Sequence, residues 1–272
     1  MKTKIQIKRF LDSLVFDIAS ESKKLKEIVR NWVLATDGEY IITIYDLERK
    51  NFYLFTDPLG RLPLYYHISN TDLLISRECK FIAQLVDNLA FDRLAWGQML
   101  WFGWPMGEKT FIDEIKRVPA GVFLKAWDES GHMSLEISNL YTINFDNKDN
   151  SKKSINKIAS ELDDLMIQAI RHRSKGFSNN IIALSGGQDS RALSAGYKKA
   201  SVPFETTTYK NDKKKSQEDA YIAQQIAEIL QVNWLLFEVP QVDYSDVEKL
   251  IWMKDGLNYA GMAYILPFIE NI

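Results

Sequence analysis

The first half of the chain is patterned as strands and turns. Three pairs of short segments, rich in aromatic and β-branched residues, are each separated by a polar turn, and each pair predicts a β-hairpin. The pairs are 39–46 with 52–56, 62–68 with 73–76, and 121–127 with 134–141. Helices are expected at 24–34, 78–87 and 92–100, the first because its apolar residues recur with helical spacing.

The second half has a different rhythm, in which strands alternate with helices. The predicted strands are 181–184, 204–209 and 234–239, and the predicted helices are 154–173, 189–199 and 217–230. This alternation implies βαβ units and a parallel sheet. The segment 146–153 between the halves contains no apolar side chain. We therefore predict two domains, 1–146 and 154–272.

Composition narrows the class of protein. The 34 Lys and Arg residues against 36 Asp and Glu residues give a net charge of −2, which offers no electrostatic reason to bind nucleic acid or an anionic membrane. A single cysteine excludes a disulfide framework and a cysteine-based zinc site, and it indicates a reducing compartment. No segment approaches the ~20 apolar residues of a membrane helix, and the N-terminus does not read as a signal peptide. We expect a cytoplasmic protein.

One segment carries clear chemistry. The predicted strand 181–184 ends in Ser185-Gly186-Gly187, and a helix is expected to open with Asp189 and Ser190. Glycines allow a sharp turn in which backbone N–H groups converge, and a helix N-terminus adds unpaired donors and partial positive charge. The serine hydroxyls can add donors, and Asp189 can hold Mg²⁺ against phosphates. The Gly-Lys-[Ser/Thr] ending of a Walker loop is absent.

The Ser-Gly-Gly-Gln-Asp-Ser segment resembles the pyrophosphate loop of ATP pyrophosphatases, with a ligand-free glycine turn as the alternative. Other segments in the first half narrow the resemblance. They are Asp37-Gly38-Glu39-Tyr40, Ile44-Tyr45-Asp46, Asp57–Tyr66 (DPLGRLPLYY), Ser76–Lys80 (SRECK) and Phe111–Gly121 (FIDEIKRVPAG). In this order before the loop, they resemble the glutamine-dependent asparagine synthetases and their amide-forming relatives.

The resemblance implies a fold in two parts. We expect the remainder of an N-terminal-nucleophile glutaminase domain, with four αββα layers, followed by the first half of a doubly wound ATP-pyrophosphatase (PP-loop) domain. The residues implied to hold the β,γ-pyrophosphate of ATP are Ser185, Gly186, Gly187, Asp189 and Ser190. Asp189 would also bind Mg²⁺, Leu184 would lie beside the nucleoside, and Thr207, within the strand around 206–208, would approach adenine.

The implied activity is amide formation in two steps. ATP adenylates a carboxylate with release of pyrophosphate, and ammonia derived from glutamine then displaces AMP. Aspartate is the default acceptor. Arg191, however, is more typical of relatives in peptide or polysaccharide biosynthesis, and Asp255-Gly256 does not match the acceptor region expected of true asparagine synthetases. The rivals are a lasso-peptide or β-lactam type cyclase, and a non-catalytic nucleotide-binding remnant that docks a partner. The expected partners are small molecules, and the oligomeric state is left open, with a homodimer as one assembly.

The chain departs from the family in two places. The nucleophile of the glutaminase domain is a cysteine after the initiator Met, whereas residue 2 is Lys here. Cys79 lies mid-chain and is expected to be structural. The family also continues past residue 272 with a second acidic glycine loop and a catalytic lysine. We therefore expect a fragment that is inactive alone and does not hydrolyse glutamine.

Several further features favour structural roles. The Walker-like segment 103–110 is expected to be a surface turn, and the scattered histidines form no ligand pair. The aromatic residues Trp96, Trp101, Phe102 and Trp104 are expected in a core or an interface. Lys213-Lys214-Lys215 is expected in a solvated loop that can approach phosphates. The predicted inward face of helix 154–173 contains Ile158, Leu162, Leu165 and Ala169.

Overall fold

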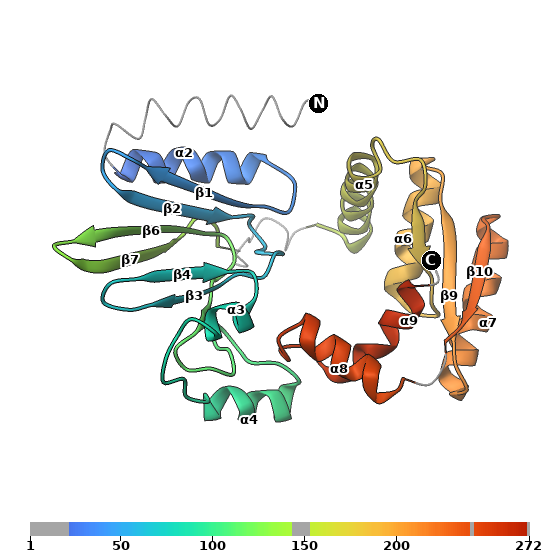
Figure 1. The fold of residues 1–272 in the computed structure, drawn as a ribbon. Helices are drawn as coiled ribbons and strands as arrows, with labels where there is room; N and C mark the ends of the chain where they lie inside the picture. The colour runs from blue at the N-terminus through green and yellow to red at the C-terminus, as the bar shows by residue number, and fades with distance from the viewer. Residues whose placement is uncertain (1–21, 143–152, 240–241, 271–272) are drawn as a thin grey trace. The chain divides into compact units, whose positions relative to one another are not determined.

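The computed structural model describes residues 22–142, 153–239 and 242–270 (Figure 1). The chain divides into two compact units, one made of Met1–Asn144 with Ile251–Tyr259 and the other of Phe145–Leu250 with Ala260–Ile272. The N-terminal unit therefore includes a short segment from late in the sequence. This segment, 251–259, is called the excursion segment. The predicted domain ranges do not assign it to the N-terminal unit, and they stay predictions.

The N-terminal unit contains two antiparallel sheets, with strand orders β1-β2-β6-β7 and β4-β3-β5. Its strands are β1 (Ile41–Asp46), β2 (Asn51–Thr56), β3 (Tyr65–Ile68), β4 (Leu73–Ser76), β5 (Lys116–Arg117), β6 (Val122–Glu129) and β7 (His132–Asn139). Its helices are α2 (Ser22–Ala35), α3 (Cys79–Ala83) and α4 (Arg93–Phe102). All three predicted hairpins are confirmed.

Alternating side chains bury both faces of the first sheet. On β2, Tyr53 and Phe55 pack with Leu25 and Val29 of α2. Leu54, between them, packs in a second cluster between the two sheets. Because successive side chains of a strand point to opposite faces, one strand serves two apolar layers.

The second sheet uses the same alternation. Tyr66 of β3 and Ile75 of β4 join the cluster between the sheets. Tyr65 and Leu74 pack on the other face with Ile82 of α3. The layers follow one another as α2, first sheet, second sheet and α3 (Figure 1).

The DPLG and PAG segments pack on each other at the end of the first sheet. Asp57 is 1% exposed, and its carboxylate accepts hydrogen bonds from the N–H groups of Leu59 (3.0 Å) and Arg61 (3.2 Å). Gly60 has φ +54° and lies against the backbone of Ala120, where an added Cβ would approach within 2.7 Å. These motif residues are therefore explained by a turn that admits no side chain at Gly60.

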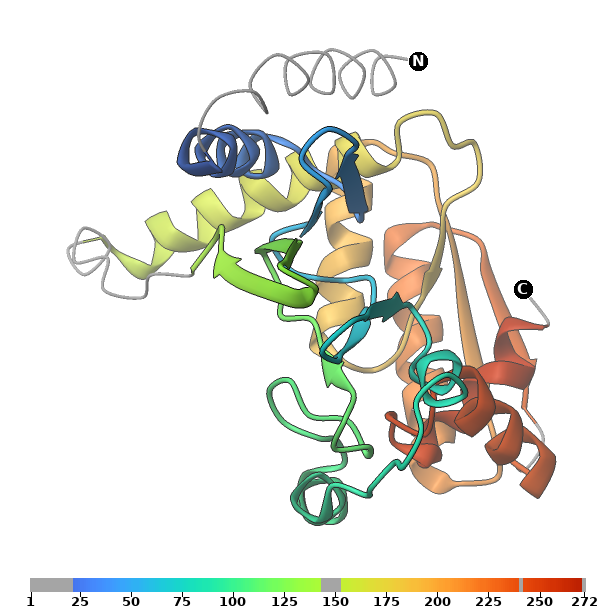
Figure 2. The ribbon, with the colours of Figure 1, turned by 60° about the vertical axis from the view of Figure 1, so that its left-hand side comes forward.

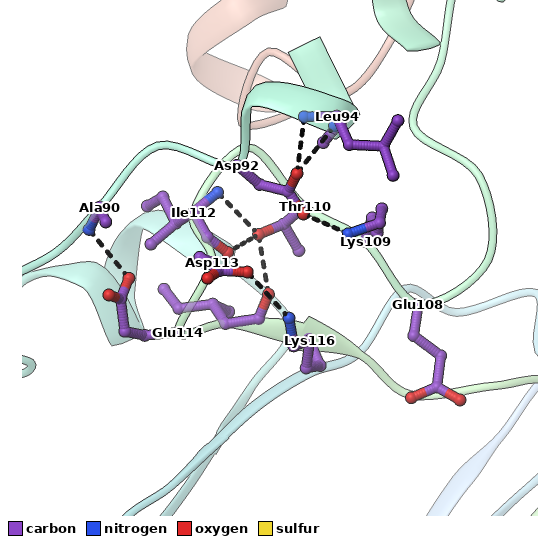
Figure 3. Close-up of polar contacts among 12 residues, drawn as sticks. Ala90, Asp92, Leu94, Glu108, Lys109, Thr110, Ile112, Asp113, Glu114 and Lys116 are labelled. Atoms are coloured by element: carbon purple, nitrogen blue, oxygen red, sulfur yellow. Dashed lines mark hydrogen bonds and ion pairs between the residues drawn. The ribbon is translucent and has the colours of Figure 1, made fainter. Parts of the chain in front are cut away.

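Helix α4 is anchored by a buried carboxylate (Figure 3). Asp92 Oδ1 accepts hydrogen bonds from the N–H groups of Leu94 and Ala95, both at 2.9 Å, and Oδ2 accepts from Lys109 Nζ at 2.5 Å. The Lys109 ammonium and these N–H groups hold the pKa of Asp92 below its usual range. Lys109 belongs to the Walker-like segment 103–110. Because it pairs with Asp92, its ammonium group is already engaged by a carboxylate.

The C-terminal unit contains a parallel sheet, as predicted, and its strand order is β10-β9-β8. Its strands are β8 (Ile181–Ala183), β9 (Glu205–Lys210) and β10 (Trp234–Glu238). Its helices are α5 (Ile155–Arg173), α6 (Gln188–Ala200), α7 (Lys214–Leu230), α8 (Tyr244–Met253), which ends in the excursion, the 3₁₀ segment η2 (Ala260–Tyr264) and α9 (Ile265–Ile269).

Helices α6 and α7 lie side by side along the sheet (Figure 2). Both crossovers step in the same direction across the parallel strands, so right-handed connections put both helices on one face. Ala223 and Ala227 of α7 pack there against Leu184 and Trp234. On the other face, Ile181 and Leu235 are exposed. The doubly wound arrangement, with helices on both faces, stays a prediction.

Three expectations about packing and boundaries are wrong. On α5, Leu162 is 66% exposed and Leu165 is 62% exposed, whereas Ile170 is buried. The aromatic residues on and after α4 are also exposed, with Trp101 at 84%, so the core alternative is wrong and the interface alternative stays a prediction. Helix α7 begins at Lys214, so part of the lysine run is helical. No helix in the described ranges is long and apolar enough to cross a membrane.

Candidate functional site

The glycine loop after β8 is tied to the neighbouring strand by two hydrogen bonds. The N–H of Leu184 donates to the carbonyl of Thr207 (2.8 Å), and the hydroxyl of Thr208 donates to the carbonyl of Leu184 (2.7 Å). The start of the loop therefore has a fixed position at the carboxyl end of the sheet. Ligands of open α/β sheets bind at this edge.

Two serines brace the loop from within. The N–H of Ser185 donates to Ser190 Oγ (3.1 Å), the two hydroxyl oxygens lie 3.0 Å apart, and the N–H of Gly187 donates to Ser185 Oγ (3.2 Å). Gly187 is the N-cap of α6 and supplies no side-chain cap. The first N–H groups of α6 are thus left for another acceptor, which suits an anion.

Gly186 allows a carboxylate to approach the loop closely. A Cβ built on Gly186 would lie 2.5 Å from Asp219 Oδ1 and 3.4 Å from the Asp219 Cα. Asp219 belongs to α7, so the absence of a side chain at Gly186 sets how near this helix comes to the loop.

A cavity of about 560 Å³ adjoins the loop. It is lined by Ser185, Thr207, Asn211, Asp219 and, from the late part of the unit, Tyr264. Thr207 is 1% exposed, and its hydroxyl oxygen is buried without a hydrogen-bond partner in the described structure. An unsatisfied buried hydroxyl is costly, so its position beside a cavity favours a ligand that supplies the partner.

Aromatic side chains form another wall of this cavity. The ring of Tyr209 lies 4.9 Å from that of Tyr264 and 5.3 Å from that of Phe268, measured between centroids. Burial raises the pKa of Tyr209, and its hydrogen bond with Tyr264 raises it further. Tyr209 is therefore a neutral side chain that can contact a planar, uncharged group.

The remaining predicted residues divide between the cavity and the open surface. Leu184 lines the cavity, although it is 2% exposed and packs against α7. Asp189 lies exposed in the first turn of α6. Within the described ranges, no group of three His, Cys, Asp or Glu side chains could hold a metal ion. A magnesium ion at Asp189 would thus need phosphate oxygens and water as its other ligands.

The sequence analysis missed Asp219 and Tyr264. It expected Lys213-Lys214-Lys215 in a solvated loop that can approach phosphates and did not name these lysines as site residues. Lys213 and Lys215 both line the cavity, where their charge suits an anion. Gly186 indicates that another element approaches the loop closely, but the sequence does not identify Asp219 as the residue that does so. The contribution of Tyr264 could not be foreseen, since it comes from a segment 55 residues beyond Tyr209.

Cys79 lacks the features of a nucleophile. It is 5% exposed, and burial raises the pKa of its thiol to about 11. The thiolate is the reactive form of cysteine, so this side chain is inert at neutral pH. It packs with Tyr65, Ile82 and Ile115, which supports the structural role expected from the sequence.

Comparison with known families assigns a domain to each half of the chain. Residues 22–136 match the glutamine amidotransferase domain, and residues 161–268 match the asparagine synthase domain. None of the curated proteins compared with the chain matches it significantly. The first range covers the two antiparallel sheets up to the middle of β7, and the second covers the parallel sheet with its glycine loop.

Proposed function

The chain belongs to the asparagine synthetase family, and we propose that its C-terminal unit binds ATP and activates a carboxylate for amide formation. The pair of domains supports ATP-dependent amidation in general. The observation that carries the nucleotide assignment is the cavity of about 560 Å³ that joins the braced glycine loop to the unsatisfied hydroxyl of Thr207.

The residues fit ATP at both ends. The N–H groups at the start of α6, with Lys213 and Lys215, suit a polyphosphate. The neutral wall of Tyr209 and the hydroxyl of Thr207 suit a base or ribose. Asp189, with phosphate oxygens, would hold Mg²⁺. The separation of the cavity into a phosphate-binding end and a base-binding end supports the PP-loop fold inferred from the motif.

When bound, ATP supplies the adenylyl group that activates a carboxylate, with release of pyrophosphate. The chain's own residues orient the phosphates and offset their charge, which are the main protein contributions to phosphate chemistry.

The proposed acceptor is aspartate, and the proposed amine is ammonia from glutamine. The layer order of the N-terminal unit supports an N-terminal-nucleophile type of fold for the amidotransferase domain.

Calorimetric titration with ATP and Mg²⁺ tests the nucleotide site. Asp189→Ala is expected to weaken binding about tenfold, the scale of one charge-assisted contact. Asp164→Ala, which removes an exposed carboxylate from α5, is the matched control and should bind as the native chain does. Absence of binding, or equal losses in both variants, would overturn the assignment.

The acceptor needs a second titration. Aspartate is added to protein saturated with a non-hydrolysable ATP analogue and Mg²⁺, and binding that depends on the analogue supports aspartate. If ATP binds but aspartate does not, the result favours the rival hypothesis, in which the acceptor is a substrate of the type used by the related amide-forming cyclases.

A further inference from the structure

A second polar cavity lies within the N-terminal unit, between the second sheet and the excursion segment 251–259. Its volume is about 710 Å³, within the usual range for small-molecule sites. The charged residues that line it are Arg77, Lys109, Arg117, Lys254, Glu78 and Asp255. All of them belong to the same compact unit, and neither matched family description assigns a ligand to this place.

Both carboxylates of this cavity are already engaged. Glu78 pairs with Lys80 at 3.0 Å. Asp255 accepts hydrogen bonds from the N–H groups of Cys79 (2.8 Å) and Lys80 (3.4 Å), and it lies 3.6 Å from the Lys80 ammonium. Lys109 is likewise engaged, because it donates to Asp92 (Figure 3).

The three remaining cations have no such partner. Among the described residues, none places a carboxylate within 4.0 Å of Arg77, Arg117 or Lys254. Arg77 also borders the apolar cavity between the two sheets. Arg117 and Lys254 line the polar cavity and not the apolar one. The four cations that line the polar cavity outnumber its two carboxylates, so the cavity presents a surplus of positive charge.

A tyrosine hydroxyl adds an uncharged donor. Tyr65 is 6% exposed, lines the cavity and makes no hydrogen bond through its hydroxyl within the described structure. It is paired in register with Arg117 on the neighbouring strand β5, so the two side chains lie on the same face of the sheet. Trp104 lines the same cavity and offers an apolar surface.

We infer that this cavity binds a small organic dianion, held by Arg77, Arg117 and Lys254 and by the hydroxyl of Tyr65. The shared chemistry is that of a phosphate monoester or a dicarboxylate. Guanidinium groups bind both in a bidentate manner. The volume exceeds what an inorganic ion needs, and Trp104 can cover the carbon skeleton. The site is independent of the proposed ATP site, which lies in the other unit.

The test titrates glycerol 1-phosphate and succinate into the whole chain at constant ionic strength, with acetate as the monoanion. Binding of either dianion, but not of acetate, is expected, and the two probes distinguish the phosphate source from the dicarboxylate source. The Arg117→Gln/Lys254→Gln variant should lose binding by tenfold or more. The matched control, Lys26→Gln/Arg93→Gln, removes the same charge from two positions outside the cavity, of which Arg93 is exposed and Lys26 is half-buried.

Two further variants keep the inference falsifiable. Tyr65→Phe, which removes only an unpaired hydroxyl, should fold normally and bind the dianion several-fold more weakly. Ser190→Ala in the glycine loop should leave dianion binding unaltered. The inference is overturned if neither dianion binds, if the charge-matched control loses as much as the cavity variant, or if Ser190→Ala removes the binding.

Discussion

The carboxylate of Asp219 occupies the space that a side chain at position 186 would need. A Cβ on Gly186 would lie 2.5 Å from Asp219 Oδ1, closer than the 3.0 Å that real Cβ atoms respect. The glycine is therefore required by a contact across two elements and not by a left-handed backbone. This relationship connects the loop after β8 to the first turns of α7.

Gly186→Ala is expected to destabilise the C-terminal unit by about 1–3 kcal/mol, the usual effect of overpacking. Asp219→Ala in the same chain should recover part of the loss, because it removes the oxygen at 2.5 Å and leaves the Cα at 3.4 Å. Urea unfolding of the two single variants and the double variant measures the coupling. Gly187→Ala is the control, since its Cβ would meet only the Ser185 hydroxyl at 3.2 Å. Additive effects of the two substitutions would contradict the contact.

Thr207→Val should stabilise the ligand-free chain and weaken its binding of ATP. The substitution keeps the shape and removes a buried, unpartnered hydroxyl, which is expected to add about 1 kcal/mol to the free energy of unfolding. The same hydroxyl is proposed to contact ATP, so affinity should fall about three- to tenfold.

Thr56→Val provides the matched comparison. Its hydroxyl is also buried without a partner, but it lies in β2 of the N-terminal unit. It should stabilise the chain by a similar amount and leave ATP affinity unchanged. Equal losses of ATP affinity in both variants would remove Thr207 from the site.

Cys79 should resist thiol reagents until the chain unfolds. Raising its pKa from 9.0 to about 11 lowers the thiolate fraction at pH 8 about 100-fold, and burial slows access further. Labelling with a chromogenic disulfide, with and without urea, measures the difference. Rapid labelling of the folded chain would show that the thiol is exposed.

The same pKa predicts a loss of stability in alkali. The unfolded thiol ionises near pH 9, whereas the folded thiol keeps its proton until about pH 11. The stabilising contribution is thus complete below pH 9 and is lost as the pH rises to 11. Compared with the native chain, Cys79→Ala should show a smaller decline of unfolding free energy between pH 8 and pH 11.

Asp92→Ala is expected to cost about 1–3 kcal/mol, because it removes both the cap of α4 and the partner of Lys109. Asp92→Asn keeps an acceptor for Leu94 and Ala95 and should cost less. Since the folded pKa of Asp92 is lowered, its contribution is complete above its usual range and is lost as the pH falls through the folded value. Acid unfolding of the three proteins, followed by circular dichroism, checks both the order and the pH range.

Local patterns were enough to predict the described strands other than the two-residue β5. The hairpin of β1 and β2 and the parallel order of β8 to β10 follow from alternation, turn residues and the switch to strand–helix repeats, which are all readable within about ten residues. The glycine loop was equally local, because its donors, its serines and the helix that follows are contiguous.

Burial could not be predicted in the same way. Leu162 and Leu165 share an apolar stripe on α5, yet they are exposed, while Met166 and Ile170 pack against Gly196. An amphipathic pattern identifies an apolar face, but the element that covers it is a matter of tertiary structure. The aromatic wall around Tyr264 and the approach of Asp219 to Gly186 could not be predicted either, because both depend on tertiary contacts.

The excursion of residues 251–259 has a consequence for biosynthesis. Asp255 receives the first N–H groups of α3, and Gly256 contacts Phe111, so the N-terminal unit lacks these contacts until the ribosome has made residue 256. At roughly 5–20 residues per second, the chain between residues 142 and 256 takes on the order of 6–20 s to emerge. During that interval α3 has no cap from this segment. The first half of the protein is therefore translated early but reaches its final packing late.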